Sequence, residues 1–193
     1  MDTPAHAVLN LVLLGREGAP ARTMPVFAGA VLPDLPIVGF YVYERAIRSM
    51  PERWIWSTGY YDHRWQAVFD LFHSLPLIVA GLLLALRFGV PRFALAFASM
   101  GLHALADLLL HHDDAHRHFF PLSNWRFASP VSYWDPRHFG HLVAPLEGIA
   151  VLAGCALLAR RFRSTRSRGV VACLAAMYVV YLSYALWMWV GPP

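Results

Sequence analysis

The chain contains no lysine, since all sixteen of its basic residues are arginine. Both residue types serve as loop charges, so we interpret this absence as genome composition. Only 15% of the residues are charged and 58% are hydrophobic, which lies outside the usual composition of soluble domains. These values predict a membrane protein.

Cysteine is almost as scarce, with only Cys155 and Cys173, both in apolar segments. A small thiol in such a segment usually fills space, so neither a disulfide nor a redox motif is expected. A secretory signal peptide is not expected either, because the start, MDTPAHAVLNLVLLGRE, has an acid and a histidine where a basic region would stand. The length of 193 residues fits a single domain, 1–193.

Apolar runs long enough to cross a bilayer recur along the chain. They predict an all-α integral membrane bundle of about five to six membrane-embedded helices. The expected ranges are 25–43, 73–89, 92–110, 144–159 and 169–190, with a shorter apolar helix at 5–15. The short turns GREGAPART and RFGVPR should make their flanking helices antiparallel neighbours. Two long connections, about 44–72 and 111–143, carry most of the polar residues.

The segment RRFRSTRSR, residues 160–168, has five arginines in nine positions and no acid. Arginine-rich connections stay in the cytoplasm, so we predict that this segment is cytoplasmic. Counting the spans back places Arg16, Arg22, Arg87 and Arg92 on the same side, and both long connections on the extracytoplasmic side. Because such an arginine run sets the topology, nucleic acid is not an expected partner.

Ionisable residues lie inside the predicted spans, where they are costly and usually mark a functional site. Asp34 stands in LPDLP, whose prolines should break the helix at that point. His103 and Asp107 are four residues apart and share one helix face, and His111 continues this stripe by another turn.

The predicted topology places these polar residues at a similar depth. His6 and His73 lie at the outer ends of their helices, and His103 and Asp107 lie in the outer half of theirs. Together with Asp34, they can converge in the outer half of the bilayer. Imidazole and carboxylate ligands suit zinc, manganese or iron, so we predict a divalent metal site with zinc as the first choice.

Two other interpretations of the same residues are open. A single histidine between membrane helices more often makes an interhelical hydrogen bond than it binds a metal. An arginine could also pair with the acids, but the arginines of these spans, Arg87 and Arg92, stand at their cytoplasmic ends, away from the acids. A shared cation would offset the cost of placing Asp34 and Asp107 near hydrocarbon, so we favour the metal site.

The segments TPAHAVLN, AVLPDLP, DHRWQAVFDLFHSLP and HALADLLLHH, in this order, resemble the bacterial membrane-bound metal-dependent hydrolases, a poorly characterised integral-membrane family. The donor order is also remotely similar to that of zinc-dependent phospholipase C and the single-strand-specific zinc nucleases, all-helical enzymes that cleave phosphodiesters with a cluster of zinc ions. The resemblance implies a hydrolase of the bacterial cytoplasmic membrane that holds more than one ion. Over about the first 120 residues, the family pattern falls on His6, Asp34, His63 with Arg64, His73 with Ser74, and His103 with Asp107.

The chain departs from the family pattern at two places. The usual His-Arg-Gly ends in Trp65 here, and the gap from His63 to His73 is wider, so whether His63 is a ligand stays open. Downstream, the spacing differs from that of the soluble enzymes, but three residues could complete a second metal position. They are His138, Glu147 and His141, of which we count His141 among the candidate ligands.

The cluster HHDDAHRH, residues 111–118, allows two interpretations. His111 is a candidate ligand on the stripe of Asp107. His112, His116 and His118 are either further ligands or part of a solvated helix end. We expect the residues beyond His112 to form mostly the rim of the site.

The predicted chemistry is hydrolysis. Asp34 and Asp107 are the candidate catalytic carboxylates, as a bridge between ions or as a general base. Arg117, Arg126 and Arg137 are candidates for binding an anionic headgroup, because a guanidinium offers paired donors. A site in the outer half of the bilayer is open to lipids or lipid-linked phosphates. The expected function is therefore a phosphoesterase or lipid hydrolase.

Three other functions stay open. A di-iron histidine-box oxygenase or desaturase would use many histidines around two irons, as HHDDAHRH and HFGH suggest. A divalent-metal transporter would use the same donors for its cargo. A non-catalytic membrane assembly factor would tolerate the replacement of His103 and Asp107 by asparagine. The sequence does not predict an oligomeric state.

Overall fold

In the computed structural model, which describes residues 1–16 and 18–190, every regular element is a helix. The all-helical bundle confirms the predicted fold class. The principal helices are α1 (Thr3–Leu14), α2 (Pro20–Val31), α3 (Leu35–Val42), α5 (His63–Phe72), α6 (Leu75–Arg87), α7 (Pro91–Leu110), α8 (Gly140–Arg161) and α9 (Thr165–Val190). The shorter elements are the 3-10 turns η1 (Leu32–Asp34) and η4 (Pro136–His138), the π-helical segments η2 (Tyr43–Ile47) and η3 (Ile55–Gly59), and α4 (Glu52–Trp54).

Five helical segments are long and apolar enough to cross a bilayer, which agrees with the predicted number. They are Ala21–Ile47, His63–Arg87, Pro91–Leu110, Gly140–Arg161 and Thr165–Tyr184. The helix α1 is apolar but shorter, as predicted.

The prediction of one long connection over 44–72 is wrong in part, because α5 lies within it and is followed at once by α6. Asp62 caps α5 by accepting a hydrogen bond from the backbone N–H of Arg64 at 2.9 Å. Ser74 caps α6 in the same way. The polar first turn of α5 concealed this helix in the hydropathy pattern.

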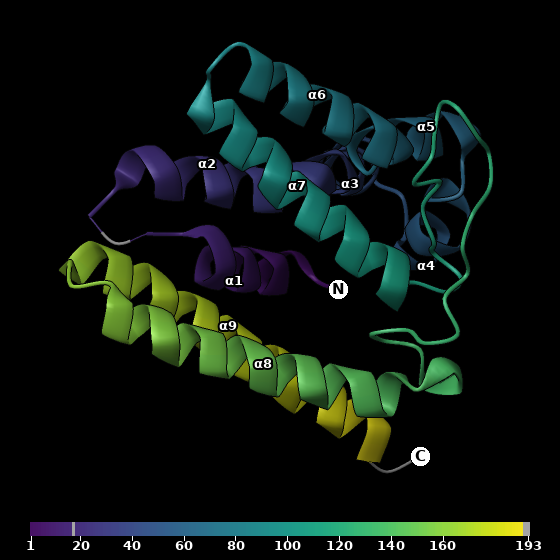
Figure 1. Cartoon of the computed structure of the whole chain (residues 1–193). Helices are drawn as coiled ribbons and strands as arrows, with labels where there is room; N and C mark the ends of the chain where they lie inside the picture. The colour runs from purple at the N-terminus through teal and green to yellow at the C-terminus, as the bar shows by residue number, and fades with distance from the viewer. Residues whose placement is uncertain (17, 191–193) are drawn as a thin grey trace.

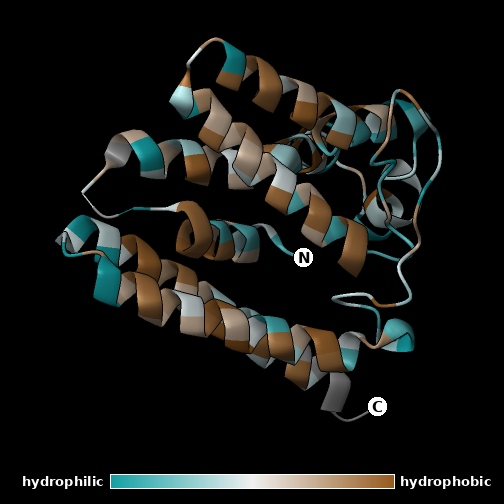
Figure 2. Ribbon diagram, viewed as in Figure 1, coloured by the Kyte–Doolittle hydropathy of each residue, from teal (hydrophilic) through white to brown (hydrophobic). Residues whose placement is uncertain are grey.

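The two ends of the bundle differ in character. Figure 1 shows the turns α1–α2, α6–α7 and α8–α9 at one end, and the long connection after α7 at the other. The helices α1 and α2, and likewise α6 and α7, are packed antiparallel neighbours, as their short turns predicted. Figure 2 shows hydrophilic residues mainly at the helix ends and in the loops, with hydrophobic residues along the helix walls. The arginine-bearing turns therefore share one end of the bundle.

The predicted break at Asp34 is present. The helix α2 ends at Val31, and the 3-10 turn η1 joins it to α3. The backbone N–H of Leu35 donates to the carbonyl of Leu32, which closes this tighter turn. Pro36 has no N–H and its ring would clash with the carbonyl four residues earlier, so a regular α-helix cannot continue here. The break leaves Asp34 at a joint between two helices.

A chain of buried polar groups sets the register of α1, α2 and α7. The Asn10 Nδ2 donates to the Oγ and to the carbonyl of Ser99, both at 2.9 Å. The Ser99 Oγ in turn donates to the carbonyl of Val26 at 2.7 Å. One helical turn from these groups, toward the end that holds the long connection, lie His6, Ala30 and His103. These hydrogen bonds, called the clamp of Asn10 and Ser99 below, therefore fix the position along the helix axes at which His6 and His103 meet.

The close approach of α2 and α7 generates a stability prediction. A Cβ on Gly29 would lie 2.1 Å from the carbonyl oxygen of Ala96 and 2.9 Å from the Cβ of Ser99. Gly29→Ala should therefore reduce the free energy of unfolding by about 1–3 kcal/mol through overpacking. Gly39→Ala is the control, because no heavy atom lies within 4 Å of that Cβ. Thermal unfolding of both variants in detergent tests this, and equal stability would contradict it.

Candidate metal centre

Four predicted ligands from three parts of the chain meet in one buried cluster. Asp34 comes from η1, His73 from the α5–α6 junction, and His103 and Asp107 from α7. One ligand atom of each lies within 4.8 Å of the others. These four residues are called the metal cluster below.

The distances within the metal cluster suit a tetrahedral ion. The His103 Nε2 lies 3.0 Å from Asp107 Oδ2 and 3.4 Å from Asp34 Oδ1. The His73 Nε2 lies 3.4 Å and 3.7 Å from the same two oxygens. Zinc bonds of 2.0–2.1 Å at tetrahedral angles separate neighbouring ligand atoms by about 3.3 Å. The observed separations bracket that value.

Backbone carbonyls fix the tautomers of both histidines. The His73 Nδ1 lies 2.9 Å from the carbonyl oxygen of Phe69, and the His103 Nδ1 lies 2.8 Å from that of Ala30. A carbonyl only accepts, so each Nδ1 carries a hydrogen, and a neutral ring then presents its lone pair at Nε2. Both Nε2 atoms are buried without a hydrogen-bond partner. Imidazole ligands of metals are held in this way by a hydrogen bond on the other nitrogen.

Burial makes this arrangement costly without a cation. His73, His103 and Asp107 are buried, and the Asp34 side chain is only 14% exposed. The Met1 amino nitrogen lies 3.0 Å from Asp107 Oδ1, on the side away from His73 and His103, and among the described residues no arginine lies within ion-pair distance of Asp34 or Asp107. Two carboxylates that face imidazole lone pairs in an apolar bundle are stabilised by a shared positive charge. The four residues can therefore hold a divalent metal ion.

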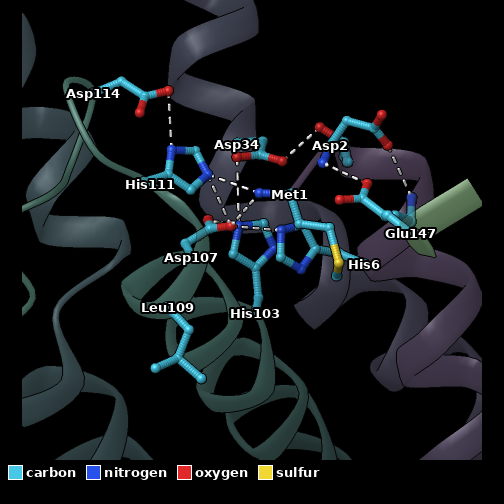
Figure 3. A network of polar contacts seen from close by, with 12 residues as sticks. Met1, Asp2, His6, Asp34, His103, Asp107, Leu109, His111, Asp114 and Glu147 are labelled. Atoms are coloured by element: carbon cyan, nitrogen blue, oxygen red, sulfur yellow. Dashed lines mark hydrogen bonds and ion pairs between the residues drawn. The ribbon is translucent and has the colours of Figure 1, made fainter. Parts of the chain in front are cut away.

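Further groups hold the carboxylates in place (Figure 3). The Thr3 hydroxyl donates to Asp34 Oδ2, which leaves Oδ1 turned to the histidines. The second oxygen of Asp107, Oδ1, lies 2.9 Å from the His6 Nε2 and 3.2 Å from the His111 Nε2. The His6 ring also stacks on the His103 ring, with centroids 3.5 Å apart. His6 and His111, both predicted ligands, thus border the metal cluster on the far side of Asp107.

The connection after α7 folds back over the metal cluster. The backbone N–H of Leu75 donates to the carbonyl of His118 at 2.8 Å, and the Ser74 hydroxyl donates to that of Phe120. His116 and His118 are only 2% and 1% exposed, so the prediction that they form a solvated rim is wrong. The His116 ring stacks on that of His73 with centroids 3.9 Å apart. Tertiary contacts to the α5–α6 junction remove these histidines from solvent.

The loop histidines are held neutral. Burial lowers the pKa of His116 to about 3 and that of His118 to about 4. Neutral imidazoles retain a lone pair, which a metal requires.

Asp70 and Asp114 are two site residues that the sequence reasoning missed. Asp70 is fully buried on α5 and accepts hydrogen bonds from the backbone N–H and the Nε of Arg117, while its Oδ1 lies 3.6 Å from the His116 Nδ1. The Asp114 Oδ2 lies 3.0 Å from the His111 Nδ1. The available signals were the three-residue spacing of Asp70 and His73, and the same spacing of His111 and Asp114.

A pocket of about 450 Å³ opens beside the metal cluster. Asp34, His111, Asp114 and His116 line it together with Thr3. Aromatic side chains from both long connections form much of the remaining wall, namely Trp56, Tyr60, Tyr61, Tyr133 and Trp134. A small group can therefore reach Asp34 from outside the bundle.

Four other polar candidates are not members of the metal cluster. His63 and His141 are exposed and belong to no described contact of the metal cluster. His138 contacts Asp135 at 3.0 Å, and its ring stacks on that of His112. Glu147 accepts hydrogen bonds from the Tyr178 hydroxyl and, at 3.5 Å, from the backbone N–H of Asp2, so it belongs to the polar network beside the metal cluster (Figure 3). The structure does not bring His141 to the other predicted ligands, because it lies in the first turn of α8 and faces outward.

The three candidate substrate-binding arginines are engaged in the connection itself. Arg117 pairs with Asp70, Arg126 donates to the side chain of Gln66 at 2.9 Å, and Arg137 pairs with Asp135 at 2.9 Å. Among the described residues that line the pocket, none is an arginine. Their visible role is to hold the connection to α5 and to itself, and substrate binding by Arg117, Arg126 and Arg137 stays a prediction.

No family model, curated protein or solved structure matches the chain. The resemblance to the membrane-bound metal-dependent hydrolases therefore stays a prediction.

Metal binding to the cluster should stabilise the fold. An ion that binds only the folded state at one hundred times its Kd adds about 2.7 kcal/mol. Zinc should therefore raise the unfolding midpoint of the chelator-treated protein in detergent, and His103→Asn should remove this effect. His63→Asn is the control, because His63 is exposed and outside the cluster. A midpoint that does not respond to zinc, manganese or iron would contradict the metal site.

Proposed function

We propose that the protein is a membrane-embedded, metal-dependent hydrolase that acts on a phosphoester of a lipid or lipid-linked substrate. The observation that carries this proposal is the pair of tautomer-locked imidazoles facing two buried carboxylates beside an open pocket. Two His and two Asp ligands suit zinc, with manganese and iron as alternatives.

A divalent ion in the cluster would polarise a substrate oxygen and lower the pKa of a water molecule toward neutrality. The two carboxylates have different access to the pocket. Asp34 lines the pocket, whereas Asp107 is almost fully buried and does not. We assign Asp34 to accept the proton of the attacking water and Asp107 to hold positive charge. Thr3 keeps Asp34 in position through its hydrogen bond.

The position of the pocket supports a lipid substrate. Ile37 and Val38 of α3 form one side of it, and α3 belongs to the spanning segment Ala21–Ile47. Val38 lines the pocket and is nevertheless 51% exposed, so the pocket wall continues into the apolar outer surface of the helix. A headgroup could therefore enter sideways while its acyl chains stay in the bilayer.

Two of the alternative functions fit the site less well. A transporter needs a polar path beyond the site, but the clamp of Asn10 and Ser99 fills the space next to it. The side chains of Val8, Leu11, Val151, Cys155 and Leu158 belong to an apolar core. A histidine-box oxygenase gathers many histidines, whereas half of the residues in the metal cluster are carboxylates.

We further propose that the chain lies in the bacterial cytoplasmic membrane, with residues 160–168 in the cytoplasm and the metal cluster toward the other side. The arginine-bearing turns at one end support this orientation. In a background without Cys155 and Cys173, an impermeant maleimide should label Ser123→Cys on intact cells. It should label Ser164→Cys only after permeabilisation. Both serines are exposed, and the opposite pattern would invert the topology.

Hydrolysis is the direct test of the proposed function. The zinc-loaded protein in detergent should release headgroup or phosphate from phospholipid mixed micelles. Asp34→Asn should lower the rate by a factor on the order of 10²–10⁴ or more, because the variant loses the proposed general base and a charged metal ligand together. Asp113→Asn is the matched control, because Asp113 lies outside the cluster and the pocket lining. Equal rates for Asp34→Asn and the wild type, or no phosphoester cleavage at all, would refute the proposal.

A further inference from the structure

A second group of atoms that could bind a metal ion lies on the side of Asp107 that faces the pocket. The metal cluster uses the Oδ2 of this residue, and Oδ1 points away from His73 and His103 toward the His111 Nε2 at 3.2 Å. His111 and His116 both line the pocket. A carboxylate whose two oxygens face different sets of imidazoles has the geometry of a bridge between two ions.

His111 and His116 share one arrangement. Each has a carboxylate behind its Nδ1: Asp114 at 3.0 Å from His111, and Asp70 at 3.6 Å from His116. On both rings, Nε2 is therefore the nitrogen that is available to bind a metal ion in the pocket. Carboxylates on the far nitrogen orient metal-bound imidazoles and raise their basicity. Asp70 is itself fixed by Arg117, so this backing group is rigid.

The two rings have a spacing similar to that within the metal cluster. The His111 and His116 centroids are 5.9 Å apart, and those of His73 and His103 are 5.2 Å apart. All four residues are buried, so these rings are held by packing. The pocket-side rings therefore share a centroid separation close to that of the two histidines in the metal cluster.

Positive charge is favoured at this position. The amino nitrogen of Met1 lies 2.8 Å from the His111 Nε2 and 3.0 Å from the Asp107 Oδ1 (Figure 3). The space between His111 and Asp107 therefore accommodates a cationic group.

We infer that Asp107 Oδ1, His111 and His116 form a second divalent-metal position, with Asp114 and Asp70 as positioning residues behind the histidines. This inference rests on the proposed function, because Asp107 serves both positions. The second ion would be the one nearer the substrate, since its histidines line the pocket and those of the metal cluster do not. Two ions that share a carboxylate can hold the attacking and the leaving oxygen of a phosphoester.

Metal stoichiometry tests the second position. The full chain, tagged at its C-terminus, is stripped with chelator in detergent, reloaded with zinc and analysed for zinc per chain by elemental mass spectrometry. The wild type should hold two ions, and His111→Asn and His116→Asn should each hold one. His112→Asn should still hold two, because the His112 Nδ1 faces the carbonyl of Ser129 at 2.6 Å and not the pocket. Asp114→Asn should weaken the second ion 10- to 100-fold without changing the first.

X-ray absorption of the zinc-loaded protein gives a readout that does not depend on any variant folding. The wild type should show metal–metal scattering at about 3.5–4 Å. One zinc per wild-type chain without this scattering would overturn the second position and leave the proposed function standing. Two ions retained in both His111→Asn and His116→Asn would also overturn it. No bound zinc at all would remove the proposed function as well.

Discussion

Two buried carboxylates facing two imidazole lone pairs form the constraint on which the rest of the site depends. Asp34 and Asp107 carry negative charge into an apolar bundle, and the carbonyls of Phe69 and Ala30 hold the protons of His73 and His103 on the far side of each ring. When both rings are neutral, the two imidazoles and two carboxylates turn only electron pairs toward one another at 3.0–3.7 Å, which is unfavourable unless a cation lies between them. A divalent ion satisfies all four residues at once.

The packing of the helices holds the four residues of the metal cluster in place. Hydrogen bonds from Asn10 to Ser99 and from Ser99 to Val26 lock three helices in register, and the histidines follow one turn later. The break around Asp34 turns its carboxylate into the same space. The hydrogen-bonded register of the helices and the break at Asp34 are both rigid, as the residues that support a metal site need to be. The bundle thus positions ligands from separated segments without a flexible loop among them.

Much of this arrangement could be predicted from the sequence, because its signals are local. Apolar runs predicted the five spans, LPDLP predicted the helix break, and the four-residue spacing placed His103 and Asp107 on one face. The helix α5 was missed because its first turn is polar, and with it the burial of Asp70.

The parts that escaped prediction depend on contacts between distant residues. Asp70 meets Arg117 across 47 positions, and the burial of His116 follows from the folding of its connection onto α5 and α6. The tautomer of His103 depends on the carbonyl of Ala30, 73 positions away. Local periodicity does not reveal such contacts, so the sequence left open whether His116 is a ligand or part of a solvated helix end.

Anomalous diffraction from crystals of the zinc-loaded protein, collected on both sides of the zinc edge, tests the central claim most directly. We expect a peak bonded to Asp34 Oδ1, Asp107 Oδ2 and the Nε2 atoms of His73 and His103. Density without an anomalous peak, in which these four side chains are joined only by hydrogen bonds, would contradict the metal centre.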